Sequence, residues 1–111
     1  LIMGFTFKEN CSDIRNTKVE DIMNKLIKLN YKVDIFDNNA NEIEFNKKYK
    51  KKLISNFKKI KKNFYHAIIL AVKHKEFRKT KIQIIKSFGV NKALIYDLKN
   101  IFPENNEILK F

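Results

Sequence analysis

The chain has 111 residues, 44% of them apolar, a size and composition that suit one folded domain and exclude a disordered chain. Its longest apolar run, residues 67–72, is too short to span a bilayer, and its single cysteine, Cys11, excludes an intrachain disulfide. The net charge of +12 comes almost entirely from lysines scattered along the chain, with only two arginines, which favours a solvated basic surface over a nucleic-acid interface.

The first predicted element is an apolar strand at residues 1–5, and a loop dense in polar side chains follows it at residues 8–15. A helix is predicted over residues 17–29, because apolar residues recur there with helical spacing. Thr17 and Glu20 form a capping-box pattern at its start, and Asn30 is a plausible stop. In open α/β sheets, ligands bind beyond the carboxyl ends of the strands, so this first loop is a candidate binding site.

Shorter elements are predicted in the middle of the chain. Residues 31–36 read as a second strand ending at Asp37, and residues 41–49 as a helix that buries Ile43 and Phe45. Three further features are expected after them: a short edge strand at 53–54, a brief helix capped by Ser55, and inward-facing Phe57 and Ile60.

The second half of the chain contains the most apolar predicted strand. Residues 67–72 are uninterruptedly apolar, as in a parallel strand covered on both faces. A helix is predicted over residues 75–88, with Gly89 in a left-handed conformation at its end. The last full strand is predicted at residues 93–96, ended by Asp97.

Strands that alternate with helices predict an α/β fold: three layers, an open parallel sheet of about five strands, and helices on both faces, as in Rossmann-like folds. If the strand order is 3-2-1-4-5, the chain reverses direction between the first and fourth strands. The loops that carry Lys8, His74 and Lys99 then share one edge of the sheet. Basic side chains converging at this switch point suit an anionic ligand such as a diphosphate.

Four blocks of the sequence resemble the C-terminal, UDP-binding domain of the UDP-glucose/GDP-mannose dehydrogenase family. They occur in the family's order and cover essentially the whole chain, 1–111. The first block is most similar to the branch that acts on UDP-N-acetylhexosamines for surface polysaccharides. The blocks are GFTFKEN…DIRNTKV (4–19), VDIFD…AN (33–41), AIILAVKHKEF (67–77) and YDLKN (96–100).

This resemblance implies an NAD-dependent enzyme that oxidises the C6 alcohol of a UDP-hexose or UDP-N-acetylhexosamine twice, to the uronic acid, through a thioester on a cysteine. The chain, which starts inside a strand, would be a fragment that supplies the nucleotide clamp and is inactive alone. An NAD-binding domain and a central helical domain with the catalytic cysteine would lie upstream. The resemblance also implies a cytoplasmic homo-oligomer that serves polysaccharide or capsule synthesis, with no membrane partner.

The resemblance also implies roles for individual residues. Phe7 and Lys8 would contact the uridine and phosphate part of the UDP-sugar, and either Lys99 or Asn100 would supply another substrate contact. Arg15 would reach NAD, which is bound mainly by the absent N-terminal domain. No catalytic residue and no metal ligand are expected in this chain.

Three alternatives remain open from the residues themselves. His74 can be a general base, although a lone histidine after a buried strand is more often structural. Cys11 can be a nucleophile, although no activating histidine is adjacent in sequence, so a structural or incidental role is favoured. The rival function is a stand-alone, non-enzymatic basic α/β module that binds nucleic acid or another polyanion.

Overall fold

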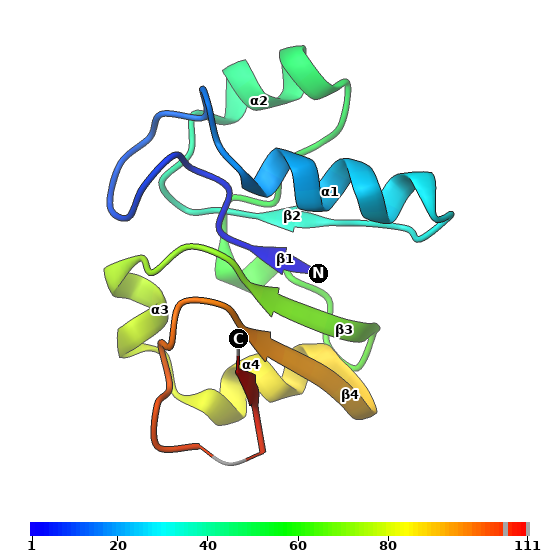
Figure 1. Ribbon diagram of the computed structural model, residues 1–111, viewed down its shortest axis with the longest axis vertical. Coiled ribbons are helices and arrows are strands. Elements are labelled where there is room, and N and C mark those ends of the chain that lie inside the picture. The colour runs from blue at the N-terminus through cyan, green and yellow to red at the C-terminus, as the bar shows by residue number, and fades with distance from the viewer. Residues whose placement is uncertain (106, 111) are drawn as a thin grey trace.

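The computed structural model describes residues 1–105 and 107–110, and its centre is a parallel β-sheet (Figure 1). Within the described residues the sheet has five strands in the order β2-β1-β3-β4-β5, and every paired strand is parallel to its neighbour. The strands are β1 (Ile2–Met3), β2 (Ile35–Phe36), β3 (Tyr65–Leu70), β4 (Gly89–Asp97) and β5 (Leu109–Lys110).

The strand order confirms the predicted topology. Ile54 forms a single parallel bridge with Phe36 beside β2, so the expected edge strand at 53–54 is reduced to that bridge. If the bridge at Ile54 is counted as the third strand, β3 and β4 become the fourth and fifth, and the order across the sheet is 3-2-1-4-5. β5 then lies beyond β4 at the far edge. The chain reverses direction between β1 and β3, which are neighbours in the sheet.

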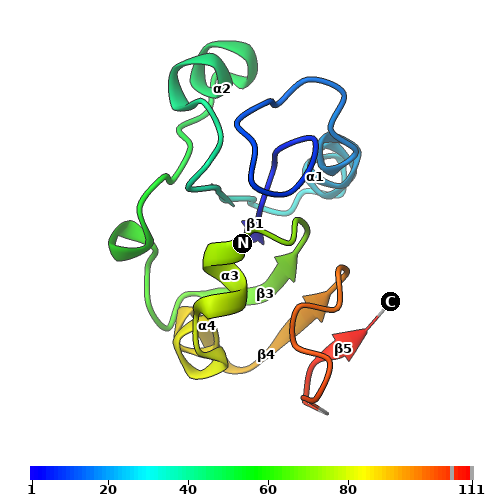
Figure 2. The ribbon, with the colours of Figure 1, turned by 90° about the vertical axis from the view of Figure 1, so that its left-hand side faces the viewer.

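Helices lie on both faces of the sheet, as predicted (Figure 2). One face packs against α1 and α2, with Ile2 and Ile35 buried between. The other face packs against α3 and α4, with Met3 and Leu70 buried between. The helices are α1 (Val19–Lys28), α2 (Glu42–Tyr49), α3 (Lys75–Lys79), α4 (Ile82–Phe88) and a 3₁₀ turn, η1 (Phe57–Lys59).

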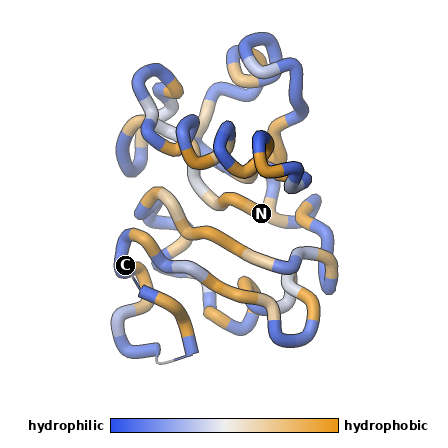
Figure 3. The backbone as a smooth tube through the Cα atoms, turned by 45° about the vertical axis from the view of Figure 1, so that its right-hand side comes forward, coloured by the Kyte–Doolittle hydropathy of each residue, from blue (hydrophilic) through white to orange (hydrophobic). Residues whose placement is uncertain are grey.

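Hydropathy follows this layering (Figure 3). The strands are largely apolar, whereas α1 alternates between an apolar stripe and a polar outer face. Val19 and Met23 on that stripe are buried, and the lysines of α1 are exposed. Burial of an amphipathic stripe is the main source of stability for a helix of this length.

The start of α1 departs from the sequence pattern, whereas its end follows the pattern. The capping box is wrong: Lys18 occupies the N-cap position without a side-chain bond, and the Thr17 hydroxyl instead accepts from the Val19 N–H at 3.2 Å. The stop at Asn30 is confirmed, because Asn30 adopts a left-handed φ of 70°. Its N–H donates to the Ile27 carbonyl at 2.9 Å, and the Tyr31 N–H donates to the Leu26 carbonyl at 3.0 Å, which is a Schellman motif.

Two expectations for the middle of the chain are wrong. Ile43 is 82% exposed, because α2 turns Phe45 alone fully inward. The 3₁₀ turn η1 is capped by the Asn56 side chain, which accepts from the Lys58 N–H. Ser55 instead donates its hydroxyl hydrogen to Glu42.

The single helix expected over residues 75–88 is two helices. The hydroxyl and the N–H of Thr80 both donate to the Glu76 carbonyl, and Thr80 then turns extended, which ends α3. The left-handed conformation expected at Gly89 is also wrong, since Gly89 has a φ of −89° and starts β4 directly after α4. A glycine suits this position because a Cβ there would lie 2.6 Å from the Ala93 Cβ.

Gly4 brings the exits of β1 and β3 close together. Its φ is +99°, a conformation that side chains rarely adopt, and an added Cβ would lie 2.7 Å from the Val72 Cβ. The segment after β1 therefore crosses directly against the segment after β3. This close approach places the first loop beside the switch point of the sheet.

Candidate functional site

A surface pocket of about 420 Å³ lies at the carboxyl edge of the sheet, where the exits of three strands meet. Residues 6–9 line it after β1, residues 71–73 after β3, and Lys99 after β4. Residues 16–19 close it at the start of α1. The pocket therefore occupies the switch point, where open α/β sheets bind their ligands.

The lining of this pocket is cationic and contains one exposed aromatic ring. Lysines enter it from four segments, Lys8, Lys18, Lys73 and Lys99, and Glu9 is the acidic residue of the lining. Phe7 is 56% exposed there, which is unusual for so large an apolar side chain. Ammonium groups around an aromatic ring form a surface suited to a nucleotide's phosphates and base.

Sequence reasoning named Phe7, Lys8 and Lys99 but missed Lys18 and Lys73. Lys73 directly follows the apolar run 67–72, so the strand-exit rule that selected Lys8 also selects Lys73. Lys18 is brought in by the start of α1, a contribution that no local pattern indicated.

Two other predicted residues lie outside the lining. Asn100 is exposed with a left-handed φ of 54°, next to Lys99 in sequence but outside the pocket. Arg15 pairs with Asp13 through Nε at 3.0 Å and through its terminal nitrogen at 3.1 Å. The side-chain hydrogen bond between them lowers the pKa of Asp13 and raises that of Arg15. Arg15 is therefore held by its neighbour, with its guanidinium largely exposed.

The loop that presents Phe7 and Lys8 is closed by its own main chain. The Phe7 N–H donates to the Asp13 carbonyl at 2.7 Å. The Lys8 carbonyl accepts from the Thr6 hydroxyl at 2.8 Å and from the Cys11 Sγ at 3.2 Å. Cys11 thus contributes a hydrogen bond within the loop, in line with the structural role favoured for it.

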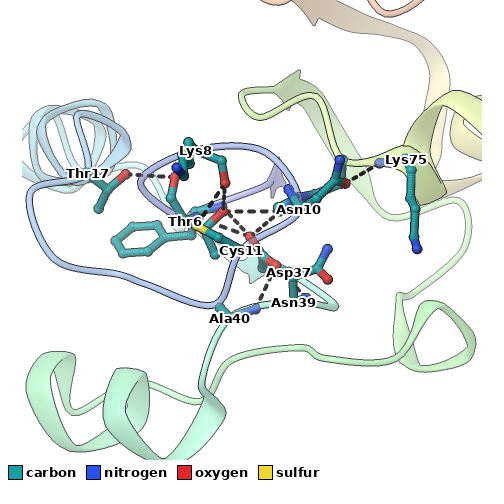
Figure 4. A network of polar contacts seen from close by, with 11 residues as sticks. Thr6, Lys8, Asn10, Cys11, Thr17, Asp37, Asn39, Ala40 and Lys75 are labelled. Atoms are coloured by element: carbon teal, nitrogen blue, oxygen red, sulfur yellow. Dashed lines mark hydrogen bonds and ion pairs between the residues drawn. The ribbon is translucent and has the colours of Figure 1, made fainter.

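A buried polar cluster supports this loop from below (Figure 4). Asp37, at the exit of β2, accepts from the N–H groups of Phe5 and Thr6 at 2.7 and 3.2 Å. Its other oxygen accepts from the N–H groups of Asn39 and Ala40. Burial alone raises the pKa of Asp37, but the hydrogen bond from His74 and those from the main chain hold it below its usual range.

His74 belongs to this cluster and not to the pocket. Its side chain is fully buried, with Nε2 at 2.9 Å from the Asp37 carboxylate. The expectation that His74 joins Lys8 and Lys99 as a converging basic group is therefore wrong, because its side chain is buried against Asp37. Its burial leaves no path to a ligand in the pocket, so the general-base alternative has no geometric support.

The described residues offer neither a metal-binding cluster nor a membrane-spanning helix. Residues 1–105 and 107–110 contain no cluster of three or more His, Cys, Asp or Glu side chains that could hold a metal ion. Across the same residues, every helix is too short or too polar to cross a bilayer.

Comparison with known proteins assigns the chain to a family. Residues 1–104 match the model of the UDP binding domain of the UDP-glucose/GDP-mannose dehydrogenase family. The chain belongs to this family. A UDP-binding domain accounts for a cationic pocket at the switch point, and the rival polyanion-binding module is not favoured.

Curated relatives of this UDP-binding domain agree with the family. The chain is 44% identical to a UDP-N-acetyl-D-glucosamine 6-dehydrogenase of Salmonella typhi over 103 residues, which are 93% of the chain and 24% of the relative. It is 38% identical to an enzyme of the same name from Pseudomonas aeruginosa over 110 residues, 99% of the chain and 25% of the relative. Protein CapL of Staphylococcus aureus is 34% identical over 103 residues, which are 90% of the chain and 23% of the relative. The chain thus spans about a quarter of each relative's length.

A solved structure supports the fold. The UDP-N-acetyl-mannosamine dehydrogenase Cap5O from S. aureus superposes with a TM-score of 0.70 at 18% identity, over 99% of this chain and 24% of that one. Likeness at this identity establishes the same Rossmann-like arrangement of strands and helices.

Proposed function

We propose that this chain is the substrate-binding domain of a cytoplasmic, NAD-dependent UDP-N-acetylhexosamine 6-dehydrogenase of surface polysaccharide or capsule synthesis. The reaction is a two-fold oxidation of the sugar's C6 alcohol to a carboxylate. The observation that carries the proposal is the meeting of Phe7, Lys8 and Lys99 in one pocket of a UDP-binding domain. The names of the relatives support the N-acetylhexosamine substrate class.

In this proposal the pocket grips the UDP end of the substrate. The ammonium groups of Lys8, Lys73 and Lys99 neutralise the diphosphate, and the exposed Phe7 ring packs against the uridine. Asn100 lies outside the lining, so we assign the substrate contact to Lys99. The domain moves no proton itself: its binding energy holds the remote C6 carbon in place for oxidation.

NAD would be held mainly outside this chain, in a domain upstream. Neither of the two glycines forms a strand-to-helix phosphate turn, because Gly89 starts β4 and Gly4 fits tightly against Val72. This domain offers NAD the exposed guanidinium of Arg15, a donor suited to nucleotide phosphate and oriented by Asp13. Bound NAD would supply the hydride acceptor. A central helical domain would supply the catalytic cysteine, and the enzyme would be a homo-oligomer.

The test is an activity screen of the full-length protein with NAD and a panel of UDP-N-acetylglucosamine, UDP-N-acetylgalactosamine, UDP-glucose and GDP-mannose. We expect NADH formation with a UDP-N-acetylhexosamine and two equivalents of NADH per sugar oxidised. Absence of NADH with every nucleotide sugar, at protein concentrations where UDP binds, would refute the proposed activity.

A further inference from the structure

The turn that follows Lys8 is held from inside the protein at one residue, Asn10. Asn10 lies in an exposed loop and has a left-handed φ of 58°. Its N–H donates to Nδ1 of the buried His74 at 3.0 Å, and its side-chain oxygen accepts from the Lys75 N–H at 2.8 Å. A surface turn is thus attached at two points to the start of α3, as Figure 4 shows for Lys75.

These contacts define the proton arrangement of the His74 ring. Because Nδ1 accepts from the Asn10 N–H, Nδ1 carries no hydrogen, and the ring hydrogen is on Nε2, facing the Asp37 carboxylate at 2.9 Å. The Thr6 hydroxyl lies 3.3 Å from Nε2 and donates its own hydrogen to the Lys8 carbonyl. The ring therefore acts as donor on one side and acceptor on the other.

The ring connects three strand exits at the switch point. His74 follows β3, Asp37 follows β2, and Asn10 belongs to the loop after β1. His74 and Asp37 are fully buried, so neither touches a ligand in the pocket. Their effect on a ligand must pass through the main chain between Thr6 and Asn10, which carries Phe7 and Lys8.

We propose that His74 is a positioning residue for nucleotide binding: its Nδ1 fixes the Asn10 main chain and so presents Lys8 to the pocket already ordered. The inference rests on the proposed function for the identity of the ligand. Ordering the loop before binding removes an entropic cost that each encounter with UDP would otherwise include.

Two isosteric variants separate the two sides of the ring. His74→Gln places an amide near Nε2, which keeps the Asp37 contact and loses the acceptor for Asn10. His74→Asn places an amide oxygen near Nδ1, which keeps the Asn10 contact and loses Asp37. The matched control is His66→Gln, at the chain's other histidine, which is exposed on β3.

The measurements are UDP affinity by calorimetry on the full-length protein, KM for NAD, and the thermal midpoint. We expect His74→Gln to weaken UDP binding about tenfold while KM for NAD stays within about twofold. His74→Asn should stay within about threefold of wild type for UDP, with a lower thermal midpoint. Equal losses of UDP affinity in both variants, or no loss in His74→Gln, would overturn the proposal.

The design keeps the two proposals distinguishable. Wild-type protein that binds UDP without oxidising any UDP-sugar would sink the proposed activity, while the UDP titrations still decide the role of His74. Wild-type protein that does not bind UDP would overturn both. If His74→Gln does not fold, hydrogen exchange of the Asn10 amide in wild type decides: protection is expected, and exchange at the rate of a free loop contradicts the proposal.

Discussion

Lys8 differs from the other exposed lysines of the chain in how its main chain is held. Its carbonyl accepts two hydrogen bonds from within the loop, and the residue two positions later is bound to a buried histidine. Most of the remaining lysines are also exposed, in loops as well as on helices, where long side chains move freely. An ammonium on a fixed main chain loses less entropy on binding, so equal charge does not mean equal contribution to the affinity.

Replacing Lys8 by Ala in the full-length enzyme should raise KM for the UDP-sugar about tenfold or more, because a charge-assisted contact to phosphate is lost. KM for NAD should stay within about twofold. Steady-state kinetics with each substrate varied in turn provides the measurement. Lys52→Ala, an exposed lysine outside the pocket, is the matched control. Equal kinetics for Lys8→Ala and Lys52→Ala would remove Lys8 from the substrate site.

At the scale of elements, periodic patterns predicted which helices and strands form, but not every position at which they end. The strand order and the stop of α1 at Asn30 follow from alternation of elements and from local turn chemistry. The break between α3 and α4 does not, because apolar residues continue at helix-like spacing on both sides of it and the helix is interrupted only by the extended backbone at Thr80 and Lys81.

The candidate site shows the same division. Residues in the loops that follow strands, such as Lys8, could be predicted because parallel strands end at a common edge. The burial of His74 depends on its contact with Asp37, which is distant in sequence, and the entry of Lys18 depends on how the first loop folds back to the start of α1. A single sequence contains no local pattern that indicates these two placements.

The end of α1 offers a test at this scale. Asn30→Ala should destabilise the domain by about 1 kcal/mol, because a Cβ without a compensating side-chain polar group is strained at a φ of 70°. Asn30→Gly should leave the free energy of unfolding within a few tenths of a kcal/mol, or raise it slightly. Urea denaturation of both variants is the measurement. If the Ala variant proves as stable as the Gly variant, the left-handed conformation at residue 30 contributes nothing to the choice of residue or to the stability of the domain.

At the scale of the whole molecule, two buried carboxylates tie down loops at the carboxyl edge of the sheet. Asp37 holds the loop after β1, and Asp97 accepts from the N–H groups of Ile101 and Phe102 and from the Lys110 ammonium. Burial raises the pKa of Asp97, but these bonds hold it below its usual value. The binding edge and the C-terminal segment therefore both depend on ionised aspartates.

This dependence predicts acid sensitivity. A carboxyl whose pKa is lower in the folded state binds fewer protons there than in the unfolded state, so stability rises with pH. We expect the free energy of unfolding to be full above about pH 4 and to fall below it, as Asp37 and Asp97 protonate. Thermal denaturation from pH 7 to pH 3 measures this.

Asp37→Asn should cost about 2 kcal/mol at neutral pH and flatten the acid limb. Its control is Asp21→Asn, at an exposed position on α1, which should keep the wild-type slope. A wild-type profile that stays level down to pH 3 would contradict the role of both buried carboxylates.

The anchoring of the first loop has a consequence for variation among relatives and for engineering. The loop is attached to the protein body through the main chain of Phe5, Thr6, Asn10 and Ser12 and through the side chain of Asn10, whereas within the described residues no hydrogen bond involves the side chain of Glu9 or Ser12. Exchanging Glu9, the acidic residue of the lining, is expected to change the charge of the pocket and to leave these anchoring bonds intact. Glu9 is therefore a position at which natural variation and a designed library can both change the side chain without removing an anchoring bond of the loop.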